Sequence, residues 1–214
     1  IEKTPIKHVA LASMGDLLGF WQGHWITFAV RHLAKMVPAF KLPLNSARTV
    51  THFKDCLSLG AGRKLSQPTV TMDSIAFLQY TGGTTGLSKG AVLTHRNIVA
   101  AVLQAEAWFR PALKRVGDPS AMNMIAALPL YHIFALGLCL MSVRLGSHMT
   151  LVPNPRDFAG FVNVLKKRPF HMLPAVNTLF NALLQQPQFK AVDFSQLCVS
   201  QAGGMAASEG TARN

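Results

Sequence analysis

The sequence predicts an α/β protein in which a mainly parallel sheet is covered by helices. The main observation is that, from Met124 onward, short apolar runs alternate with longer segments of helical periodicity. The chain has 214 residues, half of them hydrophobic, so it is long enough to bury a sizeable core. Repeated strand–helix units favour parallel strands, because each helix returns the chain to the same edge of the sheet.

The N-terminal third, residues 1–73, is the least regular part of the sequence. We expect a short strand at 8–12, a basic amphipathic helix within 16–37, and then a connector that carries Pro, Ser and Gly. The helix has apolar residues toward one side and basic residues toward the other: Trp21, Trp25, Phe28 and Leu33, against Arg31, His32 and Lys35. It either covers the protein's own sheet or lies on a lipid surface, and the sequence leaves both alternatives open.

The α/β core is expected over 74–205, beginning with two strands. The first covers 74–80, and the second covers 91–93 after a loop rich in Gly and Thr. Thr94 is the expected N-cap of a helix over 96–109, because its hydroxyl can accept a bond from a free backbone N–H of the first turn. The loop therefore joins two strands.

The rest of the core is predicted as alternating strands and helices. Asp157 is the expected cap of the middle helix, which ends before Pro169. The predicted strands cover 124–128, 149–152, 170–173 and 197–201, and the predicted helices cover 131–145, 158–167 and 177–186. Residues 206–214 have no apolar periodicity, so we expect a flexible tail there.

Charge, cysteine spacing and the length of apolar runs limit the classes of function that the sequence can have. Twenty-one Lys and Arg against nine Asp and Glu give a formal charge of +12, which suits phosphate-bearing ligands, an anionic membrane face or nucleic acid. The three cysteines are far apart and predict no metal site, and a reducing compartment is expected. The longest apolar stretch, 17–30, is interrupted and falls short of the ~20 residues of a membrane span.

The start of the sequence lacks both an initial Met and a secretory signal. We therefore expect a segment cut from a longer cytoplasmic protein. A peripheral contact with the inner face of the membrane is the open alternative.

The segment from Thr81 to Gly90 carries the chemistry. It reads TGGTTGLSKG, and it combines glycines, hydroxyl side chains and Lys89 directly after a strand. Glycines let consecutive backbone N–H groups turn toward one anion, and Lys89 adds a positive charge. The segment is not a Walker A loop, because Ser88 precedes the lysine and Gly90 follows it. A polyphosphate is the expected ligand.

Four motifs together resemble the AMP-forming acyl-CoA synthetase family, most closely the bacterial long-chain fatty-acid CoA ligases. They are YTGGTTGLSKGAVLTHRN at 80–97, LPLYHIFA at 128–135, NTLFNALL at 177–184 and AGGM at 202–205. The resemblance implies part of the large N-terminal domain of the adenylate-forming fold. It also implies a two-step reaction: a fatty acid and ATP give acyl-adenylate and pyrophosphate, and coenzyme A then displaces AMP.

The resemblance also implies the site residues. Lys89 and His132 are the expected catalytic residues, and His132 lies beside the acyl group in the family. The nucleotide phosphates are expected at Thr81, Gly82, Gly83, Thr84, Thr85, Gly86 and Lys89, and the acyl substrate at Tyr131, His132, Phe134, Gly203 and Gly204. The family often has Pro before the lysine, where this chain has Ser88.

Other parts of the family's site are absent from this sequence. These are the motif that stacks adenine and holds Mg²⁺, the acid that binds ribose, and the mobile C-terminal domain. We therefore expect no metal ligand here, Mg²⁺ bound outside this chain, and no turnover by the chain alone. Two alternatives remain: an adenylate-forming ligase for an aryl, short-chain or amino acid and, more distantly, a basic nucleic-acid-binding module, which the spread of Lys and Arg disfavours.

Overall fold

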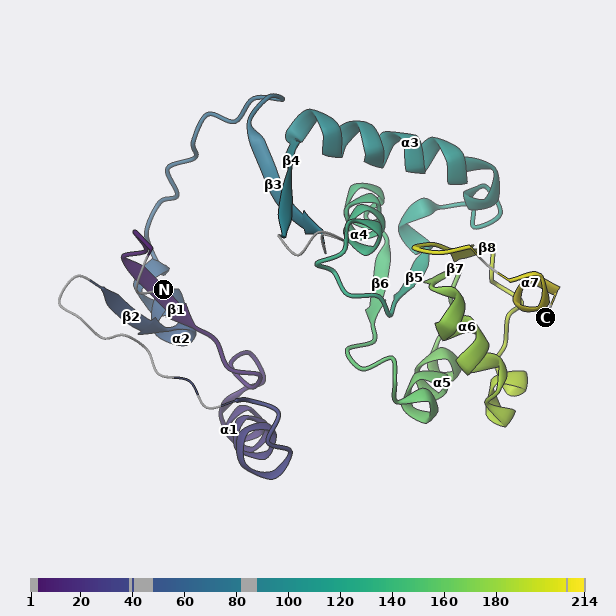
Figure 1. Cartoon of the computed structure of the whole chain (residues 1–214), viewed down its shortest axis with the longest axis horizontal. Coiled ribbons are helices and arrows are strands. Elements are labelled where there is room, and N and C mark those ends of the chain that lie inside the picture. The colour runs from purple at the N-terminus through teal and green to yellow at the C-terminus, as the bar shows by residue number, and fades with distance from the viewer. Residues whose placement is uncertain (1–3, 39, 41–47, 82–87, 207, 214) are drawn as a thin grey trace. The chain divides into compact units, whose positions relative to one another are not determined.

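The protein is described from a computed structural model, which covers residues 4–38, 40, 48–81, 88–206 and 208–213. The chain divides into two compact units, Ile1–Pro68 and Thr69–Asn214 (Figure 1). The second unit contains most of the elements that the sequence predicts, including every motif of the expected site.

The first unit is built on two short parallel strands. Its elements are β1 (His8–Leu11), α1 (Phe20–Phe28), the π-helical turn η1 (Ala29–Leu33), β2 (Thr49–His52) and α2 (Phe53–Gly60). The strand expected at 8–12 is present. The prediction of an irregular connector up to residue 73 is wrong for residues 49–60, which form β2 and α2. β2 has four residues and pairs with a strand far away in the sequence, so no local pattern predicts it.

Apolar side chains of α1 and η1 are exposed in this unit. Trp21 is 84% exposed, Trp25 63% and Leu33 64%. Inside its own unit the helix therefore does not cover a core with these residues, and the lipid-surface alternative stays a prediction. Among the helices of the described ranges, none is long and apolar enough to span a bilayer.

The second unit begins with an antiparallel hairpin, β3 (Ile75–Thr81) and β4 (Lys89–Thr94), followed directly by α3 (His95–Leu113). The predicted cap is confirmed. The Asn97 N–H donates to Thr94 Oγ1 over 3.3 Å, and the Thr94 N–H donates to Asn97 Oδ1 over 2.9 Å. Arg96 also pairs with Asp73 over 3.0 Å, which ties the first turn of α3 to the start of β3.

The main sheet has four parallel strands in the order β6-β5-β7-β8. The predicted α/β class is thus confirmed, and so is the Asp157 cap, whose Oδ1 accepts from the Gly160 N–H over 3.0 Å. The elements are β5 (Asn123–Ala126), α4 (Ile133–Leu145), β6 (His148–Leu151), α5 (Phe158–Lys167), β7 (Met172–Ala175), α6 (Asn177–Leu184) and β8 (Val199–Ala202), with 3₁₀ turns η2 (Pro119–Ala121) and η3 (Pro187–Ala191).

The two central strands bury alternate residues in two different cores. Met124 and Met172 pack with α3 and α4, whereas Ile125 and Leu173 pack with α5 and α6. Successive side chains of a strand point to opposite faces of the sheet, so helices cover both faces of β5 and β7. This arrangement leaves the carboxyl ends of the strands as the place for a site.

The C-terminal residues differ from the flexible tail that we expected. Glu209–Arg213 forms a short helix, α7. The Ser208 N–H donates to Asn177 Oδ1 over 3.0 Å, and the Thr211 hydroxyl donates to Asn181 Oδ1. Hydrogen bonds to α6 hold this segment in place. The prediction missed them because it relied on apolar periodicity, which carries no information about hydrogen bonds.

A polar network joins three strands at the amino ends of the main sheet. The Asn123 N–H donates to Nδ1 of His171 over 3.0 Å, and the Asn123 side chain donates to the Pro169 carbonyl and accepts from Thr150, each over 2.9 Å. Burial lowers the pKa of the His171 imidazole below its ordinary value of 6.5. The folded state therefore favours the neutral imidazole ring of His171.

His171 is expected to make stability depend on pH. As pH falls below the unfolded-state pKa of 6.5, the unfolded chain binds a proton that the folded chain does not, so the free energy of unfolding decreases. His171→Asn keeps an acceptor oxygen near the Nδ1 position but does not titrate. Urea unfolding from about pH 7.5 to about pH 5.5 should show a larger stability loss for the natural chain than for the variant. Equal losses would contradict this assignment.

Candidate functional site

A pocket of about 620 Å³ lies at the carboxyl ends of strands in the main sheet. Open α/β sheets bind their ligands at this edge. Its walls are the end of β3 and the segments that follow β5, β7 and β8: Gln79, Tyr80, Thr81, Leu128, Pro129, His132, Ile133, Phe134, Ala135, Val176, Thr178, Gly204 and Met205. Most of these side chains are apolar, and a few hydroxyl groups, one amide and one imidazole interrupt them.

The end of β3 next to the loop of the β3–β4 hairpin forms part of the pocket wall. Thr81 and Lys89 are cross-strand partners, and the Thr81 hydroxyl donates to the Lys89 carbonyl over 3.5 Å. The Ser88 hydroxyl donates to the Thr81 carbonyl over 3.4 Å. The predicted phosphate ligands Gly82, Gly83, Thr84, Thr85 and Gly86 lie outside the described residues. Of that predicted set, the structure describes Thr81 and Lys89, at the two ends of the loop.

The Tyr80 ring packs across the hairpin on the backbone of Gly90. A Cβ added at Gly90 would lie 3.2 Å from Cζ of the Tyr80 ring, so the ring lies in close contact with the Gly90 backbone. Tyr80 and Gly90 are cross-strand partners in the hairpin. A larger residue at 90 would push this ring, which also lines the pocket.

His132 enters the pocket from the turn between β5 and α4. The His132 N–H donates to the Pro129 carbonyl over 3.0 Å, and the His132 carbonyl accepts from the Leu136 N–H, which makes His132 the N-cap residue of α4. The predicted helix over 131–145 thus begins at Ile133, because Tyr131 and His132 form the preceding turn. The Tyr131 side chain is 73% exposed and is not part of the pocket wall.

The Phe134 ring packs against the turn that holds the two predicted glycines. A Cβ added at Gly203 would lie 2.6 Å from Cε1 of the Phe134 ring, so only glycine fits there without a shift. Gly204 has a φ of 79°, which favours glycine. The Gly203 N–H donates to the Ala175 carbonyl over 3.2 Å and ties this turn to β7. Aromatic rings in this wall and beside the hairpin therefore depend on adjacent glycines.

The structure gathers four predicted site residues around one cavity: Thr81, His132, Phe134 and Gly204. Gly203 supports Phe134 from behind, and Lys89 lies opposite Thr81 in the hairpin. Sequence reasoning missed Gln79 and Val176, which line the same pocket. Each comes one residue before a motif, so the only available signal is its position near the end of a strand.

The lining of this pocket contains no carboxylate among the described residues. Mg²⁺ prefers oxygen ligands and is usually held by one or two carboxylates together with substrate phosphates. Within the described ranges, no group of three or more His, Cys, Asp or Glu is placed to hold a metal ion. These residues by themselves therefore do not fit a magnesium centre.

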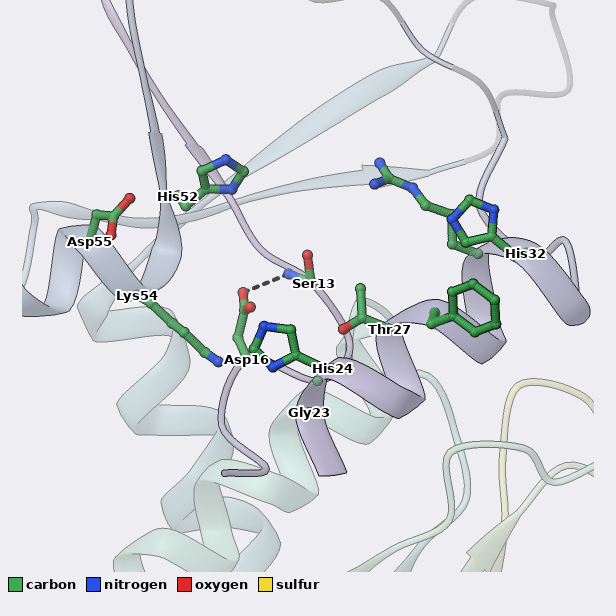
Figure 2. A pocket seen from close by; sticks show the side chains of 12 residues that line it. Ser13, Asp16, Gly23, His24, Thr27, His32, His52, Lys54 and Asp55 are labelled. Carbon is green, nitrogen blue, oxygen red and sulfur yellow. Dashed lines mark hydrogen bonds between the residues drawn. The ribbon is translucent and has the colours of Figure 1, made fainter. Parts of the chain in front are cut away.

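A second cavity, of about 450 Å³, lies in the first unit (Figure 2). Its wall mixes charges, with Asp16 and Asp55 among basic side chains from α1, η1 and α2. Asp16 accepts from the Ser13 N–H over 2.7 Å, as Figure 2 shows. Gly15 and Gly23 touch backbone to backbone at its floor. None of the residues predicted for the site lies there, and the mixed charge favours no particular ligand.

Comparison with known families identifies the chain. Residues 29–214 match the family described as AMP-binding enzyme. The chain belongs to this family. The match includes the hairpin, the His132 turn and the Gly203–Gly204 turn, so all walls of the pocket at the sheet edge lie within it.

Two relatives of the chain are bacterial proteins named long-chain-fatty-acid–CoA ligase. The protein from Haemophilus influenzae is 47% identical over 98% of this chain, and the protein from Salmonella typhimurium is 44% identical over 96%. The matched regions make up 36% and 35% of those proteins. The chain thus spans about a third of the length of these curated relatives.

Solved structures of similar fold support the architecture. ATP-bound MatB from Rhodopseudomonas palustris has a TM-score of 0.65 and 21% identity, covering all of this chain and 38% of that one. The N-terminal domain of FACL13 from Mycobacterium tuberculosis has a TM-score of 0.62 and 20% identity, covering 86% of this chain and 45% of that one. The chain therefore adopts part of a fold that these proteins share.

Proposed function

We propose that the protein containing this chain is an ATP-dependent, AMP-forming long-chain fatty-acid–CoA ligase. The observation that carries the proposal is the pocket at the sheet edge, where one end of the phosphate loop and the apolar wall around Phe134 face one cavity. A reaction between a nucleotide phosphate and the carboxyl end of a lipid needs both surfaces side by side. The names of the Haemophilus and Salmonella relatives support a long-chain fatty acid as the substrate.

The proposed first step joins the fatty acid to AMP. A carboxylate oxygen attacks the α-phosphorus of ATP, the bond from that phosphorus to the bridging oxygen breaks, and pyrophosphate leaves with the electron pair. Lys89, Thr81 and the loop residues between them bind the β- and γ-phosphates and stabilise the charge on the leaving group. Each well-placed donor of this kind contributes on the order of 3 kcal/mol to the transition state.

The proposed second step transfers the acyl group. The thiolate of coenzyme A attacks the acyl carbonyl carbon, the carbon–oxygen bond to the phosphate breaks, and AMP leaves. His132 lines the same pocket as Thr81 of the hairpin and Phe134, which supports a role for its side chain beside the acyl carboxyl group and the nucleotide. The carbonyl end of the lipid would contact His132, and its chain would follow the apolar residues Ile133, Phe134 and Val176.

Mg²⁺ would neutralise phosphate charge in the first step. Since the described lining of the pocket has no carboxylate, its protein ligands would come from the part of the protein outside this chain. The chain spans about a third of its relatives, so we also propose that it does not turn over alone. A cytoplasmic location stays a prediction.

The test is pyrophosphate exchange by the complete protein with a panel of acids. We expect exchange with palmitate to exceed that with cinnamate, acetate or an amino acid by at least about tenfold in kcat/KM, because each buried methylene adds binding. The 214-residue chain alone should show none. Preference for an aryl or amino acid would instead favour the alternative ligase, and absence of exchange with every acid would refute adenylate formation.

A further inference from the structure

Gln79 makes a hydrogen bond between two parts of the site, the β3–β4 hairpin and the turn that follows β5. It lies on β3, two residues before the end of the strand, and its Nε2 donates to the Tyr131 carbonyl over 2.9 Å. The residue is partly buried and lines the pocket. Among the described residues, this is the only hydrogen bond between the hairpin and the turn that follows β5.

The hairpin is not part of the main sheet, and its link to the core of this unit runs through α3, which follows β4 and packs with α4. β3 and β4 pair only with each other, in a two-stranded sheet, whereas β5 belongs to the four-stranded sheet. No ladder of backbone bonds therefore sets the distance between Thr81 and His132. A side-chain bond from the hairpin to the turn is the direct means of setting it.

Both ends of this bond lie next to proposed reacting groups. On one side, Gln79 is two residues from Thr81, where the phosphate loop begins. On the other side, the Tyr131 carbonyl immediately precedes His132, the N-cap residue of α4. Nothing else in the described part of the chain donates to this carbonyl, so losing the amide leaves the turn without that support.

We propose that Gln79 is a positioning residue that holds the phosphate-loop hairpin against the turn carrying His132. The inference rests on the proposed function and adds a residue that determines alignment of the nucleotide with the carboxylate. Gln79 acts through the Tyr131 carbonyl. Its loss should hinder the step that needs both sides of the pocket together more than it hinders ATP binding.

Two near-isosteric variants in the complete protein test this role. Gln79→Glu replaces the donating amide by a carboxylate, and Gln79→Met keeps the length but removes all hydrogen bonding. Gln104→Glu and Gln104→Met are the matched controls, because Gln104 is exposed on α3 and its side chain makes no hydrogen bond among the described residues. The measurement is palmitate-dependent pyrophosphate exchange over a range of ATP concentrations.

Both Gln79 variants should lower kcat by about 10- to 100-fold while the KM for ATP changes much less, because small misplacements act mainly on the transition state. The Gln104 variants should resemble the natural protein. The proposal is overturned if either Gln79 variant keeps its natural kcat, if only the KM for ATP rises, or if activity falls only in proportion to a loss of folded protein. Absence of exchange by the natural protein would refute the proposed function and would leave the structural part to the next measurement.

Amide hydrogen exchange measures the connection without any activity. In the Gln79→Met chain, the His132 amide should exchange roughly fivefold faster, the factor carried by one ordinary hydrogen bond. The Asn97 amide, which belongs to the α3 cap, should exchange as in the natural chain. An unchanged His132 amide would show that the Gln79 bond does not hold the turn, whatever the enzyme assays give.

Discussion

Replacing Lys89 by Ala in the complete protein is expected to lower kcat for palmitate-dependent pyrophosphate exchange by about 10²- to 10³-fold. Lys89 begins β4 after the proposed phosphate loop and pairs with Thr81, which lines the pocket. Its ammonium group is the one full positive charge of the TGGTTGLSKG segment. Removing it leaves backbone and hydroxyl dipoles alone to stabilise the departing pyrophosphate.

The control for this experiment is Lys166→Ala, which removes the same charge from the last turn of α5. Lys89→Arg should recover part of the lost rate, because it keeps the charge but not the compact ammonium group. A Lys89→Ala rate within about threefold of the natural rate, where a lost donor should cost far more, would show that the lysine does not act on the phosphates.

Replacing Gly203 by Ala is expected to lower kcat/KM for palmitate by about tenfold or more. The new Cβ would lie 2.6 Å from Cε1 and 2.7 Å from Cζ of the Phe134 ring, which forms part of the pocket wall. The ring is the mobile end of its side chain, so the strain is relieved when the ring moves rather than when the backbone does. The acyl site therefore changes shape, and stability falls by no more than about 1–3 kcal/mol.

The double variant Gly203→Ala with Phe134→Leu tests the cause. A smaller side chain at 134 leaves room for the methyl group, so the two changes together should cost less than the sum of the single changes. Gly137→Ala on α4 is the matched control, because a Cβ there meets nothing within 4 Å. Additive losses from the two single variants would contradict the proposed contact.

Local patterns predicted the elements whose signals lie within a few residues. Thr94 and Asp157 are caps in the structure because each cap bond spans only three residues of the chain. The four strands of the main sheet follow from short apolar runs, since both faces of β5 and β7 are covered by helices. The limits of these strands shift by one or two residues, as at β7, because pairing sets them and hydropathy does not.

The remaining elements depend on partners far away in the sequence. β2 and α2 in the first unit have no strong local pattern, and β2 exists as a strand because β1 pairs with it. Helix α7 is ordered by hydrogen bonds to Asn177 and Asn181 on α6, which a search for apolar periodicity does not detect. The role of Gln79 was not predicted for the same reason, because its partner is a backbone carbonyl, which no residue type in the sequence marks.

The sequence by itself determined the α/β class, the joining of two strands by the Gly- and Thr-rich segment, and the resemblance to adenylate-forming enzymes, because glycine spacing, caps and apolar runs are local properties. Only the tertiary structure decided that Thr81, His132, Phe134 and Gly204 surround one cavity, that Gly203 supports Phe134, and that Tyr131 lies outside the wall. These relations are set by strand order and by contacts between residues more than 50 positions apart, such as Gln79 with Tyr131 at a separation of 52. Packing in three dimensions determines them, and no short stretch of the chain contains the information.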